Sequence, residues 1–139
     1  GGVVFPGEAG LDGHSDADAV AHAVADALLG AAGLGDIGSW FPDDDPATTG
    51  ADSMALLQAV VAGVRAEGWA VANVDCTIVC EAPRIGDRRP ELQERLSGVV
   101  GAPVTVKGKR AEALGALGRR EGIACLAVSL LVEDEGAPA

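Results

Sequence analysis

Apolar residues recur every three or four positions in two stretches, which predicts amphipathic helices over residues 16–31 and 52–67. The second helix is expected to stop at Gly68. Between residues 69 and 80 the spacing changes to alternation, which predicts a strand with one buried face. The predicted core positions are Val20, Val24, Ala27, Leu28 and Ala31 in the first helix, Leu57, Val60, Val61 and Val64 in the second, and Val74, Cys76, Ile78 and Cys80 in the strand.

The other segments are shorter. Residues 1–5 resemble the end of a strand, residues 32–50 form an irregular loop, and residues 81–89 form another loop. Pro90 is expected to open a short helix through Val99. Two more strands are predicted over 104–107 and 123–132, with a loop at 109–122 between them.

These elements predict an α/β (α+β) fold, with a small mixed sheet of four to five strands and helices on one face. A sheet covered on one side leaves its other face bare. We therefore expect the chain to form an oligomer through that face.

Length and charge narrow the class of protein. The 139 residues fit a single domain over 1–139, and a net charge of −11 argues against a nucleic-acid-binding surface. No apolar run is long enough to cross a membrane, and no signal peptide is visible, so a cytoplasmic protein is expected. The three cysteines are expected to be buried free thiols.

Both histidines of the chain lie in the stretch HSDADAVAH, at positions 14 and 22. At helical pitch, His14, Asp18 and His22 would form one polar ridge, with Ser15 and Asp18 as a capping box. Imidazoles beside carboxylates are typical of metal sites, but a solvated helix start has the same composition. One helix also supplies too few ligands for zinc.

Two charged clusters have alternative interpretations. Asp43, Asp44 and Asp45 either form a solvated turn or hold substrate hydroxyls or a metal. The basic stretch KGKR at 107–110, with Arg119 and Arg120 nearby, is either a surface loop or a phosphate-binding site.

Four stretches are far more specific: GHSDADAVAHAVADALLGAAGLGDIGSWFPDDDP, GADS, NVDCTIVCEAPRI and GRREGIA. Together they resemble the 2-C-methyl-D-erythritol 2,4-cyclodiphosphate synthase family over nearly the whole chain. The resemblance implies a homotrimer, with active sites between subunits and the sheets facing a central channel. It also implies metal-dependent cyclisation of 4-diphosphocytidyl-2-C-methyl-D-erythritol 2-phosphate with release of CMP, a lyase reaction of the non-mevalonate isoprenoid pathway.

The resemblance assigns His22 as a zinc ligand, Glu112 as the ligand of Mg²⁺ or Mn²⁺, and His14 and Arg110 as catalytic residues. It places Glu121 near the channel. The implied substrate-binding residues are His14 and Ser15 at the phosphates; Asp36, Ile37 and Gly38 at the erythritol; Phe41, Pro42, Asp43, Asp44 and Asp45 in a flexible loop over that sugar; Cys80, Glu81, Ala82, Pro83, Arg84, Ile85 and Gly86 around the cytidine; and Lys109, Arg110, Ala111, Glu112, Ala116 and Arg119 elsewhere along the substrate.

Three departures from the family pattern qualify this assignment. Arg84 replaces the usual lysine, and KRAE at 109–112 replaces the usual TTTE, so that Arg110 stands where a hydroxyl normally contacts phosphate. The other zinc ligands of the family lie in an Asp-x-His motif of the first strand, upstream of the GGV at 1–3. The chain alone is therefore expected to lack its first strand and to be inactive or weakly active.

Two other functions compete with the synthase. The chain could be a truncated or degenerate homologue that binds cytidine nucleotides as a trimer without catalysis. It could also be a structural trimer that binds no nucleotide.

Overall fold

The structure, a computed structural model, describes residues 1–46 and 49–134. Three helices come first along the chain, and from the third helix onward helices and strands alternate. The elements are α1 (Ala19–Ala32), α2 (Ile37–Trp40), α3 (Ser53–Ala66), β1 (Trp69–Val79), α4 (Ile85–Val100), β2 (Val104–Lys109), α5 (Gly115–Gly118) and β3 (Ala124–Glu133).

The described residues contain a three-stranded mixed sheet in the order β2-β1-β3. Strand β1 pairs in parallel with β2 and antiparallel with β3, with Cys76 opposite Val106 and Ala127. The mixed α+β class is confirmed, but the predicted four to five strands are not found. Residues 1–5, expected to end a strand, pair with no strand here; instead the carbonyl of Val4 accepts a hydrogen bond from Arg88 (2.9 Å).

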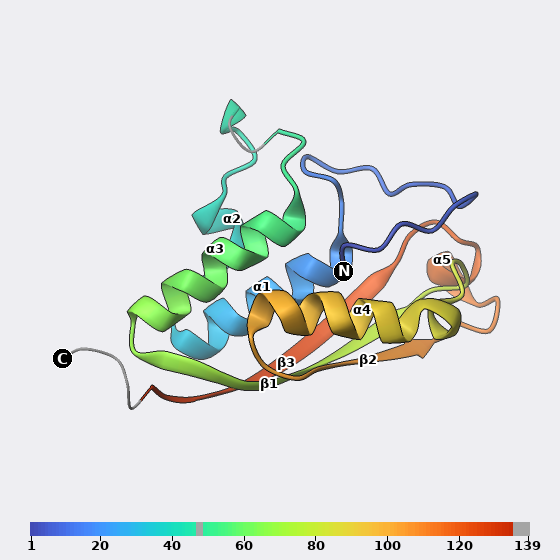
Figure 1. Ribbon diagram of the computed structural model, residues 1–139. Coiled ribbons are helices and arrows are strands. Elements are labelled where there is room, and N and C mark those ends of the chain that lie inside the picture. The colour runs from blue at the N-terminus through green and yellow to red at the C-terminus, as the bar shows by residue number, and fades with distance from the viewer. Residues whose placement is uncertain (47–48, 135–139) are drawn as a thin grey trace.

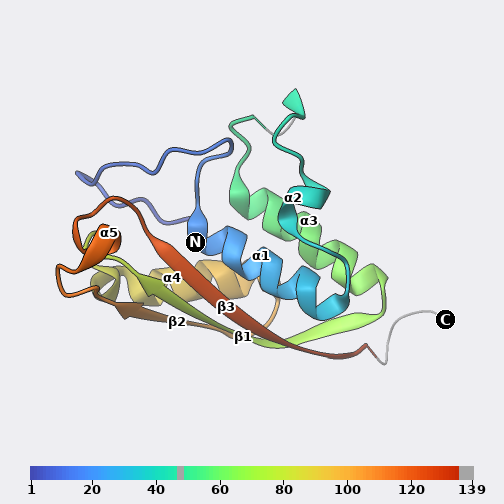
Figure 2. The ribbon, with the colours of Figure 1, turned by 180° about the vertical axis from the view of Figure 1, so that it is seen from behind.

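Helices α1, α3 and α4 lie on one face of the sheet and enclose the core with it (Figure 1). Seen from behind, β3 runs alongside α1, and β2 lies under α4 (Figure 2). The predicted inward face of β1 is buried as expected, since Val74, Cys76, Ile78 and Cys80 are at most 3% exposed. Among the described residues, no helix combines the length and hydropathy that a membrane crossing needs.

Helix boundaries differ from the sequence prediction where local contacts decide them. Helix α1 begins at Ala19 rather than residue 16, because Asp18 is its N-cap and accepts hydrogen bonds from the backbone N–H groups of Val20 and Ala21. The capping box predicted from Ser15 and Asp18 is therefore wrong. The buried stripe of α1 also shifts: Ala21, Ala25 and Leu29 join it, while Ala31 is exposed.

Helix α4 begins five residues before Pro90, which lies inside the helix. The predicted loop at 85–89 is wrong because Ile85 is buried and anchors the first turn against Gly108, where a Cβ atom would come within 3.1 Å of it. Helices α2 and α5 lie in segments predicted as loops, since four residues carry no detectable periodicity. Strand β2 extends two residues beyond the prediction, to Lys109.

The face of the sheet opposite the helices is apolar along β3. Leu126, Val128, Leu130 and Val132 alternate on that face and are 63%, 72%, 57% and 47% exposed. Beside them, Lys107 of β2 forms an ion pair with Asp75 of β1 (2.5 Å). A row of large exposed aliphatic side chains is typical of a surface that another chain covers.

Candidate active site

Two cavities contain most of the side chains singled out in the sequence. The first has a volume of about 640 Å³ and joins the segment before α1 to α2 and to the residues that lead into β3. Its predicted site residues are His14, Ser15, His22, Ile37, Gly38, Phe41 and Asp43. The fold therefore brings together the HSD segment, the DIG turn and part of the FPDDD loop.

The predicted polar ridge of His14, Asp18 and His22 is wrong. Because α1 starts after Asp18, His14 lies in the preceding turn, and the four-residue spacing from His14 to Asp18 is not helical. Asp18 turns toward the backbone and accepts a hydrogen bond from the N–H of Gly2 (2.7 Å). The two histidines nevertheless line the same cavity, and His14 Nε2 lies 3.3 Å from the hydroxyl of Thr49.

Sequence reasoning missed Ser53 and Asp16. Ser53, the first residue of α3, is 1% exposed, and its Oγ lies 2.9 Å from Nε2 of His22. The Ser53 hydroxyl donates to Oδ1 of Asp16, and its backbone N–H donates to Oδ2 (3.2 Å). Ser53 belongs to the GADS stretch and Asp16 to the HSD stretch, so both lay in the quoted motifs without an assigned role.

The turn around α2 is shaped by Asp36, which caps the helix. Its carboxylate accepts a hydrogen bond from the Ser39 backbone N–H (2.7 Å), and this bond holds the pKa of Asp36 below its usual value. Asp36 itself does not line the cavity, whereas its neighbours Ile37 and Gly38 do. Of the following loop, Phe41 and Asp43 line it; Pro42, Asp44 and Asp45 do not.

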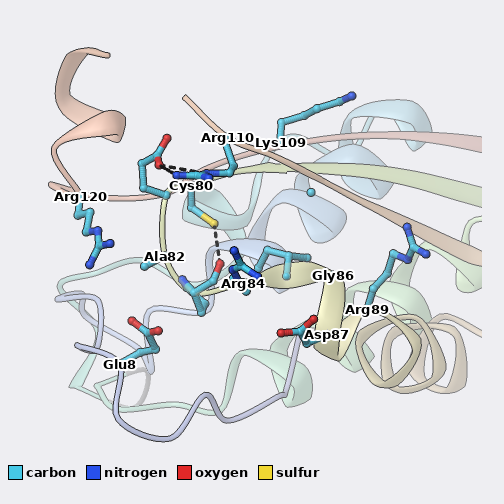
Figure 3. A pocket seen from close by; sticks show the side chains of 14 residues that line it. Glu8, Cys80, Ala82, Arg84, Gly86, Asp87, Arg89, Lys109, Arg110 and Arg120 are labelled. Atoms are coloured by element: carbon cyan, nitrogen blue, oxygen red, sulfur yellow. Dashed lines mark hydrogen bonds and ion pairs between the residues drawn. The ribbon is translucent and has the colours of Figure 1, made fainter. Parts of the chain in front are cut away.

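The second cavity, of about 510 Å³, lies at the ends of β1 and β2 and the start of α4. The whole predicted cytidine segment lines it, and the thiol of Cys80 contacts the carbonyl of Pro83 (3.5 Å) inside that loop (Figure 3). The cavity is also rich in cationic side chains: Arg84, Arg89, Lys109, Arg110 and Arg120. The basic stretch at 107–110 therefore contributes three residues to the cavity, Gly108, Lys109 and Arg110, while Lys107 remains on the open face of the sheet.

Arg110 forms an ion pair with Glu81 in the lining of this cavity (Figure 3). Its Nη2 lies 2.6 Å from Oε2 of Glu81, and the ion pair together with the backbone N–H of Ala113 lowers the pKa of the Glu81 carboxyl. The Glu81 side chain is 5% exposed, whereas that of Arg110 is 62% exposed. The guanidinium is thus fixed at its inner edge and open to solvent on its outer side.

Besides Asp36, Pro42, Asp44 and Asp45, four more predicted substrate residues lie outside both cavities: Ala111, Glu112, Ala116 and Arg119. Glu112 and Ala113 have positive φ values of 53° and 60°, an uncommon conformation for residues other than glycine. Arg119 forms an ion pair with Glu121 (2.6 Å), and Glu121 lines the first cavity while Arg120 lines the second. The segment before β3 therefore contributes to both cavities.

Few side chains in the described residues could ligate a metal ion together. Among residues 1–46 and 49–134, no three His, Cys, Asp or Glu side chains gather as a metal site. His22 fits the role of one ligand, because a hydroxyl holds one of its ring nitrogens, as is common for metal-binding histidines. A complete zinc site needs ligands in addition to this one.

Comparison with known proteins identifies the family. A sequence profile of the YgbB family matches residues 1–132. The 2-C-methyl-D-erythritol 2,4-cyclodiphosphate synthase of Bordetella petrii is 54% identical over 134 residues, which cover 94% of this chain and 83% of that protein. The synthase of Azoarcus sp. is also 54% identical, over 97% of this chain and 85% of that protein.

Solved structures agree with the sequence comparison. The bifunctional IspDF of Campylobacter jejuni matches with a TM-score of 0.86 and 38% identity, covering 89% of this chain and 34% of that one. A 2C-methyl-D-erythritol-2,4-cyclodiphosphate synthase in its CDP-bound form matches with a TM-score of 0.78 and 36% identity, over 86% of this chain and 79% of that one. The degenerate, non-catalytic alternative finds no support among these relatives. This chain therefore belongs to the YgbB family, the family of the 2-C-methyl-D-erythritol 2,4-cyclodiphosphate synthases.

Proposed function

We propose that this chain cyclises 4-diphosphocytidyl-2-C-methyl-D-erythritol 2-phosphate to 2-C-methyl-D-erythritol 2,4-cyclodiphosphate and CMP, in isoprenoid biosynthesis. The observation that carries this proposal is the gathering of the motif residues into two cavities, one with both histidines and one with the CEAPRIG loop. Identity of 54% to proteins named for this reaction supports it.

The reaction is an internal displacement. An oxygen of the 2-phosphate forms a bond to the β-phosphorus, and the bond from that phosphorus to the oxygen bridging the α- and β-phosphates breaks. CMP leaves with that oxygen and its electron pair, and no water is consumed. Because two anionic groups must meet, the enzyme has to hold the substrate folded and offset the charge repulsion.

The second cavity is the proposed cytidine site. Its loop is anchored by the contact of Cys80 with Pro83 and by buried Ile85, so the backbone that would surround the base is held in place. Arg84 and Lys109 add positive charge to an otherwise acidic chain. Arg110 is the proposed phosphate contact, with its guanidinium oriented by Glu81.

The first cavity is the proposed site of the methylerythritol and its phosphates. His14 and Ser15 line this cavity and would contact the substrate phosphates, and His14 is the residue that would stabilise the charge of the transition state. Ile37, Gly38 and Phe41 would contact the sugar, with Asp43 as the carboxylate nearest to its hydroxyls.

The proposed metal ions complete the charge balance. His22 is one ligand of Zn²⁺ or another divalent cation, and Glu112 is one ligand of Mg²⁺ or Mn²⁺; both ions need further ligands. A bound dication supplies Lewis-acid stabilisation of the phosphates, which suits a chain with a net charge of −11.

The proposed assembly is a homotrimer in which copies cover the apolar face of β3. In that arrangement the two cavities complete each other across subunits, which explains why each holds only part of the predicted site. The proposed location is the cytoplasm, since Cys76, Cys80 and Cys125 are all free thiols, as suits a reducing compartment.

The test is direct conversion of the substrate, followed by ³¹P NMR. The product of the complete gene is expected to produce the cyclic diphosphate and equimolar CMP, and EDTA should stop the reaction. His22→Ala should reduce turnover by about 100-fold or more, as expected for loss of a metal ligand. Arg95→Ala is the matched control, because Arg95 is an exposed residue of α4 paired with Glu91 outside both cavities.

Full turnover after complete removal of divalent ions would contradict the metal-dependent reaction. Binding of CDP without any cyclisation, in the presence of Zn²⁺ and Mg²⁺, would instead support the degenerate binding protein.

A further inference from the structure

Ser53 is the one polar residue among those described that is buried as a whole, at 1% exposure, and the proposed reaction gives it no role. Its hydroxyl lies between two functional groups from other segments, the Asp16 carboxylate and the His22 imidazole. Burying a polar group is unfavourable unless its hydrogen bonds are made. The position of Ser53 therefore calls for an explanation in terms of those two partners.

The hydroxyl proton of Ser53 can serve only one partner. Asp16 is a carboxylate and accepts only, so the contact between Ser53 Oγ and Asp16 Oδ1 requires the serine proton. The oxygen of Ser53 then faces Nε2 of His22, 2.9 Å away, with lone pairs alone. Two lone pairs at that distance repel, so Nε2 must carry a proton and donate it to Ser53.

A neutral imidazole with its proton on Nε2 has its lone pair on Nδ1. Among the described residues, none forms a hydrogen bond with that second nitrogen of His22. Metal ions bind the ring nitrogen that lacks the proton, while the other nitrogen donates to an oxygen of the surrounding protein.

We infer that Asp16 and Ser53 are positioning residues: the chain Asp16–Ser53–His22 fixes the imidazole as its Nε2–H tautomer and makes Nδ1 the atom that binds the metal. This inference rests on the proposed metal-dependent function. To that function it adds Asp16 and Ser53, the two residues that determine which ring nitrogen of His22 lacks the proton. It also links α3 to α1, because Ser53 opens α3 while His22 lies in the second turn of α1.

Ser15 is the competing partner, since its hydroxyl lies 3.2 Å from the same Nε2 and 3.3 Å from Ser53 Oγ. If Ser15 donated to Nε2, the tautomer would be reversed. The shorter contact belongs to Ser53, and Ser15 Oγ already accepts from the Ala17 backbone N–H (3.3 Å). The hydroxyl of Ser15 can rotate toward the cavity, whereas that of Ser53 is held by the carboxylate.

The tautomer can be measured by long-range ¹H–¹⁵N NMR of the chain labelled with ¹⁵N-histidine, at mildly alkaline pH. The sequence has only two histidines, so His14→Gln assigns the signals. We expect His22 to show a pyrrole-type Nε2 and a pyridine-type Nδ1. This measurement needs neither metal nor turnover, so it can fail while the proposed reaction stands.

Substitutions then separate positioning from general stability. Ser53→Ala should convert His22 to a mixture of tautomers, while Ser53→Thr, which keeps the hydroxyl, should preserve the Nε2–H form. Ser15→Ala is the matched control and should leave the tautomer unchanged. In the product of the complete gene, zinc affinity, measured by competition with a chromophoric chelator, should be about 10- to 100-fold weaker in Ser53→Ala than in the parent.

Two results would overturn the inference. One is a pyridine-type Nε2 in the parent chain, which requires no substitution to observe and so does not depend on a variant that folds. The other is equal zinc affinity of parent and Ser53→Ala, including no measurable binding by either, which would remove the link from Ser53 to the metal.

Discussion

At the scale of single residues, Arg110 combines a departure from the family pattern with a defined geometry. Glu81 binds its Nε and Nη2, and the outer side of the guanidinium stays exposed at the cavity. A guanidinium held on one side can contact phosphate with the other without losing much side-chain entropy.

Arg110→Ala is therefore expected to lower kcat/KM by about 10- to 100-fold, the range for one hydrogen bond to a charged group. Steady-state CMP release measures the effect, with Arg95→Ala as the control for a lost surface charge. If Arg110→Ala turned over like the parent, the arginine would be a surface residue that merely pairs with Glu81.

Two thiols predict the alkaline limit of stability. Cys76 is buried as expected, whereas Cys125 is only partly buried. Burial raises the pKa of Cys76 to about 11 and that of Cys125 to about 12, against 9.0 for an unperturbed thiol. Above pH 9 the unfolded chain releases these protons while the folded chain keeps them. The contribution of these two thiols to the free energy of unfolding should therefore be constant below about pH 9 and fall as the pH rises toward 11 and 12.

Urea unfolding at pH 8, 9, 10 and 11 measures this dependence. Between pH 8 and 11, the raised pKa of Cys76 accounts for a loss of about 1 to 3 kcal/mol in the free energy of unfolding. The free energy of unfolding of Cys76→Ala should therefore decline less steeply with pH than that of the parent. Equal slopes in the two chains would mean that another group limits stability at high pH.

At the scale of elements, the short helix α2 is held by packing rather than by its own length. Trp40 donates from Nε1 to the carbonyl of Leu34 (3.0 Å), and its ring lies against Gly63 of α3. A Cβ atom at Gly63 would come within 2.1 Å of the Trp40 ring. The absence of a side chain at Gly63 therefore lets the Trp40 ring pack against α3, which positions α2 and the cavity residues beside it.

Gly63→Ala should accordingly destabilise the fold, although alanine favours a helix over glycine by about 1 kcal/mol. We expect a lower Tm, a red shift of tryptophan fluorescence and a higher KM as Phe41 is displaced with Trp40. Gly30→Ala in α1 is the matched control: nothing lies within 4 Å of its Cβ position, so that variant should gain about 0.5 to 1 kcal/mol. A stabilised Gly63→Ala variant would show that α2 moves freely.

At the scale of the whole molecule, the apolar row on β3 predicts assembly. A charge at Val128, which is 72% exposed, would have to be buried without a partner between copies. Val128→Asp should therefore lower the mass in solution from three times the 13.8 kDa chain to that of one chain, and remove turnover with it.

Val4→Asp is the matched control, since Val4 is 76% exposed but lies in the segment before α1, away from β3. Analytical ultracentrifugation of both variants provides the measurement. A parent chain that sediments as a monomer, or a Val128→Asp variant that keeps its trimer, would contradict the proposed use of this face.

The sequence by itself determined α3, β1 and β3 to within a residue or two, because their apolar periodicity is long and regular. It also determined the family and most of the residues that line the two cavities, through motifs whose residue types and spacing are highly specific. Both kinds of information are local along the chain and therefore visible without coordinates.

Only the tertiary structure decided which residues meet across elements. Asp18 serves as a helix cap rather than as part of a histidine ridge, Ser53 reaches His22 from α3, and Glu81 forms an ion pair with Arg110 in the lining of the cavity. Each of these contacts depends on how segments far apart in sequence pack, and no periodicity along one segment encodes the position of another.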